Sequence, residues 1–475
     1  MFLKESSEKI LFALLIRDFY VFSELSKKHL DRQTKVWLVS KQQKSPHNKH
    51  QISLNPVPAR PGPGRGETDK GGWERFFKKG RDMDDVVIVS ATRAPIGRFG
   101  GALRDVTDWD LGTIVIAEAL KRAGLKGDEI DEVIMAHGFR TGDLPANSSR
   151  AVALRAGIPI ETPQFTINKA CGGSLRAISL AAQIIKSGEA DIIVAGGMES
   201  MSRAAFMLTK ARWGYRLGNG VLIDPVALFD PISGYSLGET GENVAELYKI
   251  PREDQDRFAF FSQQKAENAI KSNKFKEEIV PVPVQQKGKP PFIFDTDEHP
   301  RFGTTLEALS KLQPAFKKNG TVTAGNASGL NDGASAAVVM SRKKAREMRI
   351  PPLISIQTHV SVGVKPEIMG IGPIPATRKA LQKAKLELKD IDLIELNEAF
   401  AAQSVAVIRE LNMDIEKVNV NGGAIALGHP ISATGSILLT KIIYEMKRRH
   451  SQVGLVTMCI AGGQGIAMIV ENEQR

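Results

Sequence analysis

The two cysteines of this chain lie far apart, and each sits in a glycine-rich, apolar segment. Cys171 stands within residues 168–175 and Cys459 within residues 458–465. A fold stapled by disulfides needs more cysteines in a shorter chain, and a zinc site needs clustered Cys or His ligands. The sequence has neither pattern, so the two thiols are either buried and inert or reactive.

Cys171 is predicted at the corner between a strand and a helix. Residues 163–168 read as a strand, and residues 175–186 show the 3.6-residue apolar period of a buried helix. Free backbone N–H groups and the positive end of a helix dipole lie at such a corner, and both should lower the pKa of the thiol. Gly172 and Gly173 allow a sharp turn and close approach of a substrate. A single cysteine in an apolar segment is more often a buried packing residue than a catalytic one. Cys171 could therefore be either an inert or a reactive thiol.

Two other segments carry candidate polar groups. His429 stands between Gly428 and Pro430, just before an expected helix over residues 437–446. A histidine in so rigid a turn is either a base or oxyanion donor, or a hydrogen-bonded turn residue without further function. Asn397 ends an apolar strand before an alanine-rich helix. It either caps that helix or positions a water or a substrate oxygen.

Together these segments resemble the thiolases, which cleave or form 3-ketoacyl-CoA. Further blocks in family order are residues 88–101, 195–202, 241–245 and 320–333, and the resemblance extends from about Met83 to Glu473. It implies an α/β thiolase fold, in which two similar α/β halves pack as α-β-α-β-α layers. The sequence shows traces of this duplication, because each half carries a cysteine after an apolar strand.

The resemblance also implies a domain organisation. We expect an N-terminal half over residues 83–350 and a C-terminal half over residues 351–475. An inserted loop domain, at about 201–325, would bind CoA and help oligomers form. The apolar period weakens over this segment, which should include a helix over residues 252–271.

Carried over to this sequence, the family mechanism gives each candidate a role. Cys171 would be the nucleophile that becomes acylated, and His429 the base that accepts its proton. Cys459 would give or take the proton on the acetyl-CoA carbon. One oxyanion hole would be formed by His429 and a water held by Asn397, the other by the backbone N–H groups of Cys171 and Ala461.

Coenzyme A is the implied substrate, and no permanently bound cofactor or metal is expected. Ser328 resembles the serine that contacts pantetheine, and Arg301 resembles a basic residue near the nucleotide. Each could instead be an ordinary loop serine or a solvated surface charge. A homodimer or homotetramer is expected from the family. We expect no nucleic-acid or membrane partner, and a cytoplasmic location because the thiols should stay reduced.

Three departures from the family pattern qualify the resemblance. Gly173 and Ser174 stand in exchanged order, and Ser432 and Thr434 replace a commoner glycine and serine. Ala461 stands where glycine is usual, and it would be strained if that position has positive φ. These changes motivate an alternative function as a non-catalytic thiolase-like subunit or scaffold.

Two features argue for thiolase against its rivals. Degenerate members should lose at least one of Cys171, Asn397, His429 and Cys459, and all four are present. Condensing synthases of the same superfold use one cysteine, so Cys459 favours thiolase.

Residues 236–237 are Ser-Leu where short-chain biosynthetic thiolases usually have His-Met. This favours a general or degradative enzyme, with the chain length and the direction of reaction left open.

The first 82 residues differ in kind from the rest. They hold most of the formal net charge of +11, so the charge says little about nucleic-acid binding by the core. Residues 41–82 lack periodicity and are expected to be disordered. The extension could be a targeting peptide, although it is rich in acids, or an interaction helix over residues 10–25. We favour a third interpretation, in which translation starts at Met83.

Overall fold

The computed structural model describes residues 85–139 and 147–474, and these form one ten-stranded mixed sheet with helices on its faces. The expectations for residues 1–82 lie outside the described residues. The strands of the first half are β1 (Val86–Arg93), β2 (Gly97–Arg98), β3 (Glu132–His137), β4 (Gln164–Ile167), β5 (Ile192–Ser200) and β12 (Asn331–Ser341). Those of the second half are β13 (Ile354–Gly363), β14 (Leu393–Leu396), β15 (Val453–Ile460) and β16 (Gln464–Asn472).

The two halves of the sheet repeat one pairing pattern. In the first, β1 pairs antiparallel with β12, β12 antiparallel with β5, and β5 parallel with β3. In the second, β13 pairs antiparallel with β16, β16 antiparallel with β15, and β15 parallel with β14. A short antiparallel contact between β1 and β13 joins the halves. The prediction of two similar α/β halves is confirmed.

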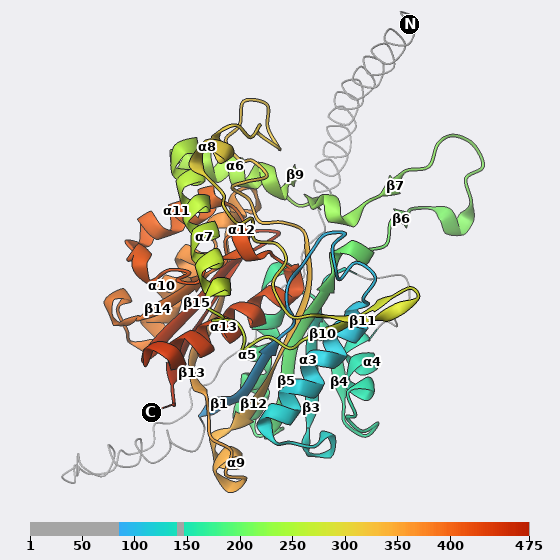
Figure 1. Cartoon of the computed structure of the whole chain (residues 1–475), viewed down its shortest axis with the longest axis vertical. Helices are drawn as coiled ribbons and strands as arrows, with labels where there is room; N and C mark the ends of the chain where they lie inside the picture. The colour runs from blue at the N-terminus through green and yellow to red at the C-terminus, as the bar shows by residue number, and fades with distance from the viewer. Residues whose placement is uncertain (1–84, 140–146, 475) are drawn as a thin grey trace, which may run out of the picture. The chain divides into compact units, whose positions relative to one another are not determined.

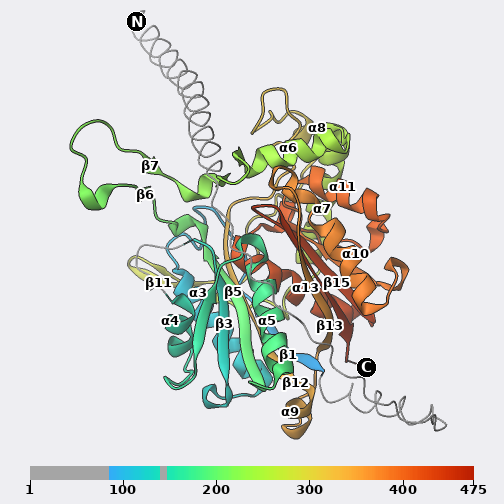
Figure 2. The ribbon, with the colours of Figure 1, turned by 180° about the vertical axis from the view of Figure 1, so that it is seen from behind.

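The helices complete five layers, seen in Figure 1 and from behind in Figure 2. Helices α5 (Gly173–Ser187) and α13 (Thr434–Arg449) lie between the two halves of the sheet, α3 (Asp108–Ala123) and α4 (Ser148–Arg155) cover the outer face of the first half, and α10 (Pro373–Ala384) and α11 (Ala401–Leu411) that of the second. Alternate residues of β1 show the layering, because Ile88 packs in the central core and Val87 in the core beneath α3.

The central helices approach each other closely. A Cβ atom at Gly435, in the first turn of α13, would lie 2.6 Å from the backbone nitrogen of Leu175 in α5. Only glycine therefore fits there, and the starts of the two helices lie side by side. Cys171 directly precedes one helix and His429 the other, so this contact brings their segments together.

The segment between β5 and β12 carries the inserted elements. They are β6 (Met207–Leu208), β7 (Leu222–Ile223), β8 (Phe229–Asp230), β9 (Tyr235–Ser236), α6 (Leu237–Leu247), α7 (Arg252–Lys271), β10 (Val282–Gln286), β11 (Lys289–Phe294) and α8 (Leu306–Ser310). The helix expected over residues 252–271 is present as α7. The short helices α9 (Arg342–Glu347) and α12 (Ala424–Leu427) lie outside this segment. The exact domain boundaries remain a prediction.

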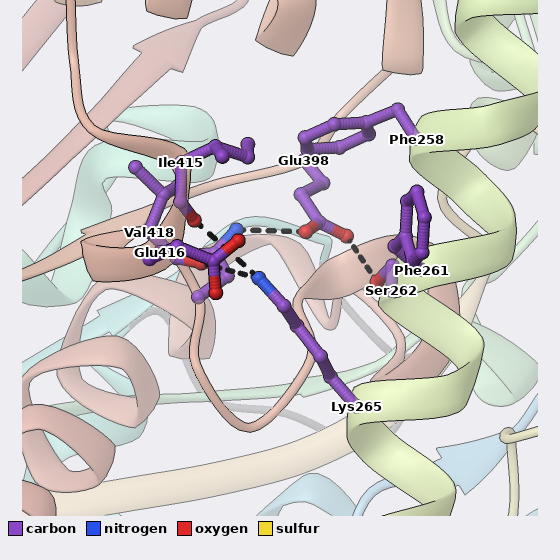
Figure 3. Close-up of a pocket in the computed structure, with 9 residues that line it drawn as sticks. Phe258, Phe261, Ser262, Lys265, Glu398, Ile415, Glu416 and Val418 are labelled. Atoms are coloured by element: carbon purple, nitrogen blue, oxygen red, sulfur yellow. Dashed lines mark hydrogen bonds between the residues drawn. The ribbon is translucent and has the colours of Figure 1, made fainter.

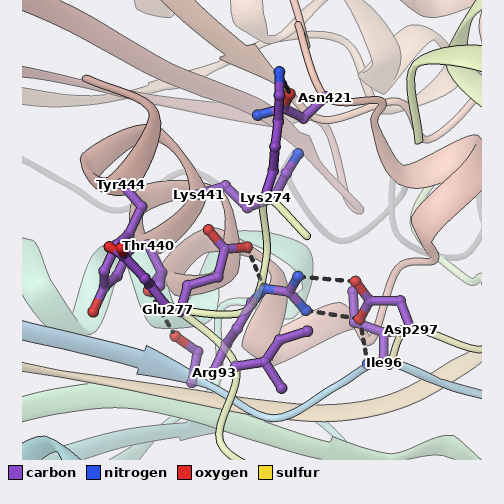
Figure 4. Close-up of polar contacts among 12 residues, drawn as sticks. Arg93, Ile96, Lys274, Glu277, Asp297, Asn421, Thr440, Lys441 and Tyr444 are labelled. Atoms are coloured by element: carbon purple, nitrogen blue, oxygen red, sulfur yellow. Dashed lines mark hydrogen bonds and ion pairs between the residues drawn. The ribbon is translucent and has the colours of Figure 1, made fainter. Parts of the chain in front are cut away.

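A buried ion-pair network fastens the inserted segment to the end of β1. The Arg93 side chain is fully buried, and its Nε lies 2.8 Å from Glu278 Oε1. Its two terminal nitrogens donate to both carboxylate oxygens of Asp297 at 2.7 and 2.8 Å, as Figure 4 shows. Because a buried charge is costly without partners, these contacts fix residues 278 and 297 on the sheet. No helix among the described residues is long and apolar enough to cross a membrane.

Candidate active site

Cys171 lies in the 3-10 turn η2 (Ala170–Gly172), between β4 and α5, as the sequence predicts. A Cβ atom at Gly172 would lie 2.4 Å from Ile460 Cδ1, and one at Gly173 would lie 2.8 Å from Ala136 Cβ. Both glycines therefore let the turn sit tightly between β15 and β3. Ser174, the residue in exchanged order, is buried, and its Oγ accepts a hydrogen bond from the Ser436 N–H of α13 at 2.9 Å.

The thiol of Cys171 is only 4% exposed, and burial raises its pKa to about 11. The backbone N–H groups of Ala461 and of Cys171 itself act in the opposite direction, and the charge of Glu199 raises the pKa further. The expectation of a lowered pKa is wrong because loss of solvation outweighs the backbone donors. The resting thiol is neutral, so forming the thiolate requires a nearby proton acceptor.

The charge state and the hydrogen bonds of His429 would allow it to accept a proton. It is buried, which lowers its pKa to about 4 and keeps the ring neutral near pH 7. Nδ1 lies 2.6 Å from Thr434 Oγ1, and Nε2 lies 3.5 Å from the amide nitrogen of Asn397. An amide nitrogen can only donate, so this geometry assigns the proton to Nδ1 and leaves a lone pair on Nε2. The His429 N–H donates to Asn331 Oδ1 at 2.9 Å, which fixes the backbone as well.

Cys459 is fully buried near the end of β15, and both cysteines are free thiols. Burial raises the pKa of its thiol, and the neighbouring Cys171 raises it further. The two sulfurs are therefore close enough to interact electrostatically. The turn after β15 takes its positive φ values at Gly462 (79°) and Gly463 (82°), and Ala461 is not among the described residues with positive φ. The strain considered for alanine at this position does not arise.

Asn397 follows β14 and is fully buried. Its backbone N–H donates to the Thr457 carbonyl at 3.0 Å, which ties it to β15 beside Cys459. The helix-cap interpretation is wrong, because α11 begins at Ala401 and its N-cap residue is Phe400. Asn397 Oδ1 has no hydrogen-bond partner among the described residues. Its side chain therefore retains an acceptor beside His429.

Glu398 anchors the segment that carries Asn397. Its buried carboxylate accepts hydrogen bonds from Ser262 Oγ at 2.7 Å, Asn419 Nδ2 at 2.7 Å and the Ile425 N–H at 3.1 Å. Figure 3 shows the carboxylate turned toward Ser262 of α7, beside a pocket of about 280 Å³. Neither cysteine lines this pocket. Glu398 thus joins the Asn397 segment to the loop that leads to His429.

Four of the seven candidate residues line two adjoining pockets, and Asn397, His429 and Cys459 line neither of them. A pocket of about 240 Å³ contains Cys171 and Ala461 and is walled mainly by apolar side chains. A larger one of about 600 Å³ contains Ser328 and Arg301. Leu228 and Leu237 line both pockets, so the two are neighbours. The structure thus brings the predicted thiol site and the predicted CoA contacts together.

Ser328 and Arg301 differ in how firmly they are held. Ser328 is half-buried, and its N–H donates to the Ala399 carbonyl at 3.0 Å, two residues from Asn397. Arg301 is exposed, and the contacts that fix it are to its backbone. Its N–H donates to Gln263 Oε1 at 2.9 Å, and its carbonyl accepts from Thr304 Oγ1 at 2.6 Å. Within residues 85–139 and 147–474, no cluster of three or more acidic, His or Cys side chains could hold a metal ion.

Sequence reasoning missed the residues that hold the candidates in place. Asn331 lies in the block 320–333 that resembles the family, but its bond to His429 is a contact across 98 positions of sequence. Thr434 could have been found, because it starts the helix five residues after His429. Glu398 is adjacent to Asn397, yet its partners come from three distant segments.

Comparison with known proteins gives one family for the whole described region. The thiolase N-terminal domain matches residues 86–343, and the thiolase C-terminal domain matches residues 350–472. An acetyl-CoA acetyltransferase of Syntrophomonas wolfei is 55% identical over 394 residues, which cover 82% of this chain and 99% of that protein.

Solved structures support the same family. An acetyl-CoA acetyltransferase of Bacillus anthracis has a TM-score of 0.81 at 47% identity, with coverage of 82% of this chain and 99% of that one. Human mitochondrial 3-ketoacyl-CoA thiolase in complex with CoA has a TM-score of 0.79 at 42% identity, with coverage of 82% and 98%. Sequence, fold and site geometry lead to the same assignment. The chain belongs to the thiolase family.

Proposed function

We propose that this chain is a CoA-dependent acyltransferase that cleaves 3-ketoacyl-CoA to acetyl-CoA and a shortened acyl-CoA, or runs the reverse Claisen condensation. The observation that carries the proposal is the pocket of Cys171. A neutral thiol faces two backbone N–H donors there, with a second buried thiol close by. The relatives named acetyl-CoA acetyltransferase and 3-ketoacyl-CoA thiolase support this reaction class.

In the cleavage direction, Cys171 Sγ attacks the 3-keto carbon of the substrate. The thiol proton passes to Nε2 of His429, which its low pKa keeps free to accept it. The carbonyl oxygen becomes an oxyanion, and the backbone N–H groups of Cys171 and Ala461 stabilise it. The same two N–H groups act on the Cys171 sulfur, where they lower the pKa of the thiol.

The bond between carbons 2 and 3 then breaks, and its electron pair passes to the acetyl-CoA enolate. His429, now protonated, donates to the enolate oxygen together with a water held by Asn397. Cys459 protonates carbon 2 and releases acetyl-CoA. The Cys459 thiolate then takes the proton of the free CoA thiol, and the CoA sulfur attacks the acyl group on Cys171. The departing Cys171 thiolate regains its proton from His429, which gives the shortened acyl-CoA and the resting enzyme. Condensation of two acetyl-CoA molecules follows the same steps in reverse.

CoA is a substrate in this scheme, and the larger pocket is its site. Ser328 would contact pantetheine, because it lies on the wall that continues toward Cys171. Arg301, exposed at the rim, would face the phosphates of the nucleotide. The solved thiolase with CoA supports CoA as the ligand of this fold.

A non-catalytic scaffold role is not favoured. One motive for it was strain at Ala461, and that residue is not in a positive-φ conformation.

Assembly into a homodimer or homotetramer, a cytoplasmic location and a role in fatty-acid β-oxidation complete the proposal. An arm over residues 206–223 supports assembly, because it exposes Phe206, Met207, Trp213, Leu217 and Val221.

Thiolysis of 3-ketoacyl-CoA tests the proposal directly. The loss of the 3-ketoacyl-CoA absorbance is followed with free CoA across a chain-length series, for the wild type and for Cys171→Ser. Activity in the wild type and none in the folded variant is the expected result, and the series defines the preferred chain length. A folded wild type that is inactive at every length, or an active Cys171→Ser, would contradict the proposal.

A further inference from the structure

Glu199 is a fully buried carboxylate that takes no part in the steps above. It lies near the end of β5, within the block 195–202 that resembles the family. A carboxylate removed from water is costly unless hydrogen bonds replace its solvation. Its partners therefore indicate what it holds together.

Those partners come from both halves of the chain. Oε1 accepts a hydrogen bond from the Phe139 N–H at 2.9 Å, and Oε2 accepts from the N–H groups of Gly138 and Ser432, both at 3.2 Å. Gly138 and Phe139 follow β3 in the first half. Ser432 belongs to the 3-10 turn η9 (Ile431–Ala433) of the second half, three residues after His429. One carboxylate thus bonds to two loops that are far apart in the sequence. These loops also meet directly, because a Cβ atom at Gly138 would lie 2.7 Å from Ser432 Oγ.

The same two loops wall the pocket of Cys171. Gly138 and Phe139 line it from the first half, and Ile431 lines it from the second half. The backbone packs closely against the carboxylate, because a Cβ atom at Gly138 would lie only 2.6 Å from Glu199 Oε2. The position of the carboxylate therefore sets the spacing between the walls.

The charge of Glu199 also faces the nucleophile. It contributes, after burial, to the raised pKa of the Cys171 thiol. On its other side, Glu199 Oε1 lies 3.9 Å from Nε2 of His137, which lies 2.8 Å from Asp108 Oδ2. The carboxylate thus lies between an acid-histidine pair and the thiol pocket, and it does not line that pocket itself.

We propose that Glu199 is a positioning residue that fixes the distance between the two walls of the acyl pocket and thereby sets which acyl-chain lengths Cys171 accepts. The inference rests on the proposed function, because it takes Cys171 as the residue that is acylated. It assigns to the carboxylate of the block 195–202 a role in substrate selection.

Two substitutions separate the geometry from the charge. Glu199→Asp keeps the charge and withdraws the carboxylate by one methylene, whereas Glu199→Gln keeps the length and removes the charge. We expect both variants to change the ratio of kcat/KM between long and short 3-ketoacyl-CoA substrates by about tenfold, the size of a one-methylene discrimination. Only Glu199→Gln should speed alkylation of Cys171 by iodoacetamide at neutral pH, which a merely structural role would not produce.

Glu278→Gln is the matched control, because Glu278 is equally buried but its carboxylate accepts from Arg93 rather than from the loops that line the pocket of Cys171. It should lower stability and leave the chain-length ratio and the alkylation rate unchanged. Wild-type ratios in both Glu199 variants, or an equal shift in Glu278→Gln, would overturn the inference. If Glu199→Gln does not fold, Glu199→Asp decides it alone. Failure of the proposed function is seen separately, as thiolysis by Cys171→Ser.

Discussion

The orientation of His429 depends on one hydroxyl. Thr434 Oγ1 lies 2.6 Å from Nδ1 inside a buried site, and its position at the start of α13 fixes where the ring can turn. Because the Asn397 amide nitrogen can only donate to Nε2, the Thr434 hydroxyl accepts a hydrogen bond from the proton on Nδ1, and the Nε2 lone pair can act as the base. The neutral thiol of Cys171 needs such a base, because burial alone keeps its proton in place near pH 7.

Replacing this hydroxyl should therefore slow acyl transfer. Thr434→Val leaves the buried Nδ1–H without a partner at a cost of about 1–3 kcal/mol, which corresponds to a roughly ten- to hundredfold lower kcat. Thr434→Ser should restore most of the rate. Thr440→Val, a buried threonine of the same helix that bonds Ser436, serves as the control for stability. Equal kcat in Thr434→Val and the wild type would show that the hydroxyl does not orient the base.

At the scale of elements, the site depends on two turns that follow or precede buried strands. The turn before α5 is tight because Gly172 and Gly173 admit neighbours that a Cβ atom would displace. The turn after β15 places its positive φ values on Gly462 and Gly463 and leaves Ala461 in an ordinary conformation. Both turns therefore direct a backbone N–H group toward the sulfur of Cys171. Neither donor residue, Cys171 or Ala461, has a strained positive φ.

Ala461→Gly should accordingly bring no benefit. Because the alanine is unstrained, glycine only adds freedom to the unfolded chain, and we expect a loss of about 0.4–1 kcal/mol in the free energy of unfolding with activity retained. Gly462→Ala, at φ 79°, should destabilise more than this. Urea denaturation of both variants makes the comparison. A more stable or more active Ala461→Gly protein would mean that the alanine is strained after all.

The local elements were predictable from the sequence, but the contacts that bring them together were not. The strand, the turn and the helix around Cys171 follow from apolar period and glycine placement, and α7 has the bounds expected for it, Arg252–Lys271. The contact of Asn331 with His429 spans 98 residues, and no local pattern indicates it. The pKa of Cys171 was predicted in the wrong direction because burial is a property of the assembled layers, whereas the helix start is visible in the sequence.

At the scale of the whole molecule, the repeated halves explain why the site lies between them. Each half supplies one cysteine segment, and α5 and α13 pack against each other so that the turn of Cys171 and the segment of His429 lie side by side. The only direct pairing of the two half-sheets described is the short contact between β1 and β13. The buried helices, and bridges such as that of Glu199 to Ser432, therefore carry much of the cohesion of the site.

The apolar arm over residues 206–223 should govern assembly. Trp213 is 86% exposed and Leu217 is 96% exposed, an arrangement that a partner surface would cover. Trp213→Ser combined with Leu217→Ser should lower the mass measured by light scattering at equal concentration. Phe261→Ser, an exposed apolar residue of α7 outside the arm, should not. An unchanged mass in the double variant would place the interface elsewhere.

The most direct test of the account is to trap the acyl-enzyme. The protein is mixed with acetyl-CoA, quenched in acid, digested and analysed by mass spectrometry, for the wild type, Cys171→Ser and Cys459→Ser. The account predicts one acetyl group on Cys171 in the wild type and in Cys459→Ser, and none in Cys171→Ser. Acetylation of Cys459 instead, or of neither cysteine in a protein that is active in thiolysis, would contradict it.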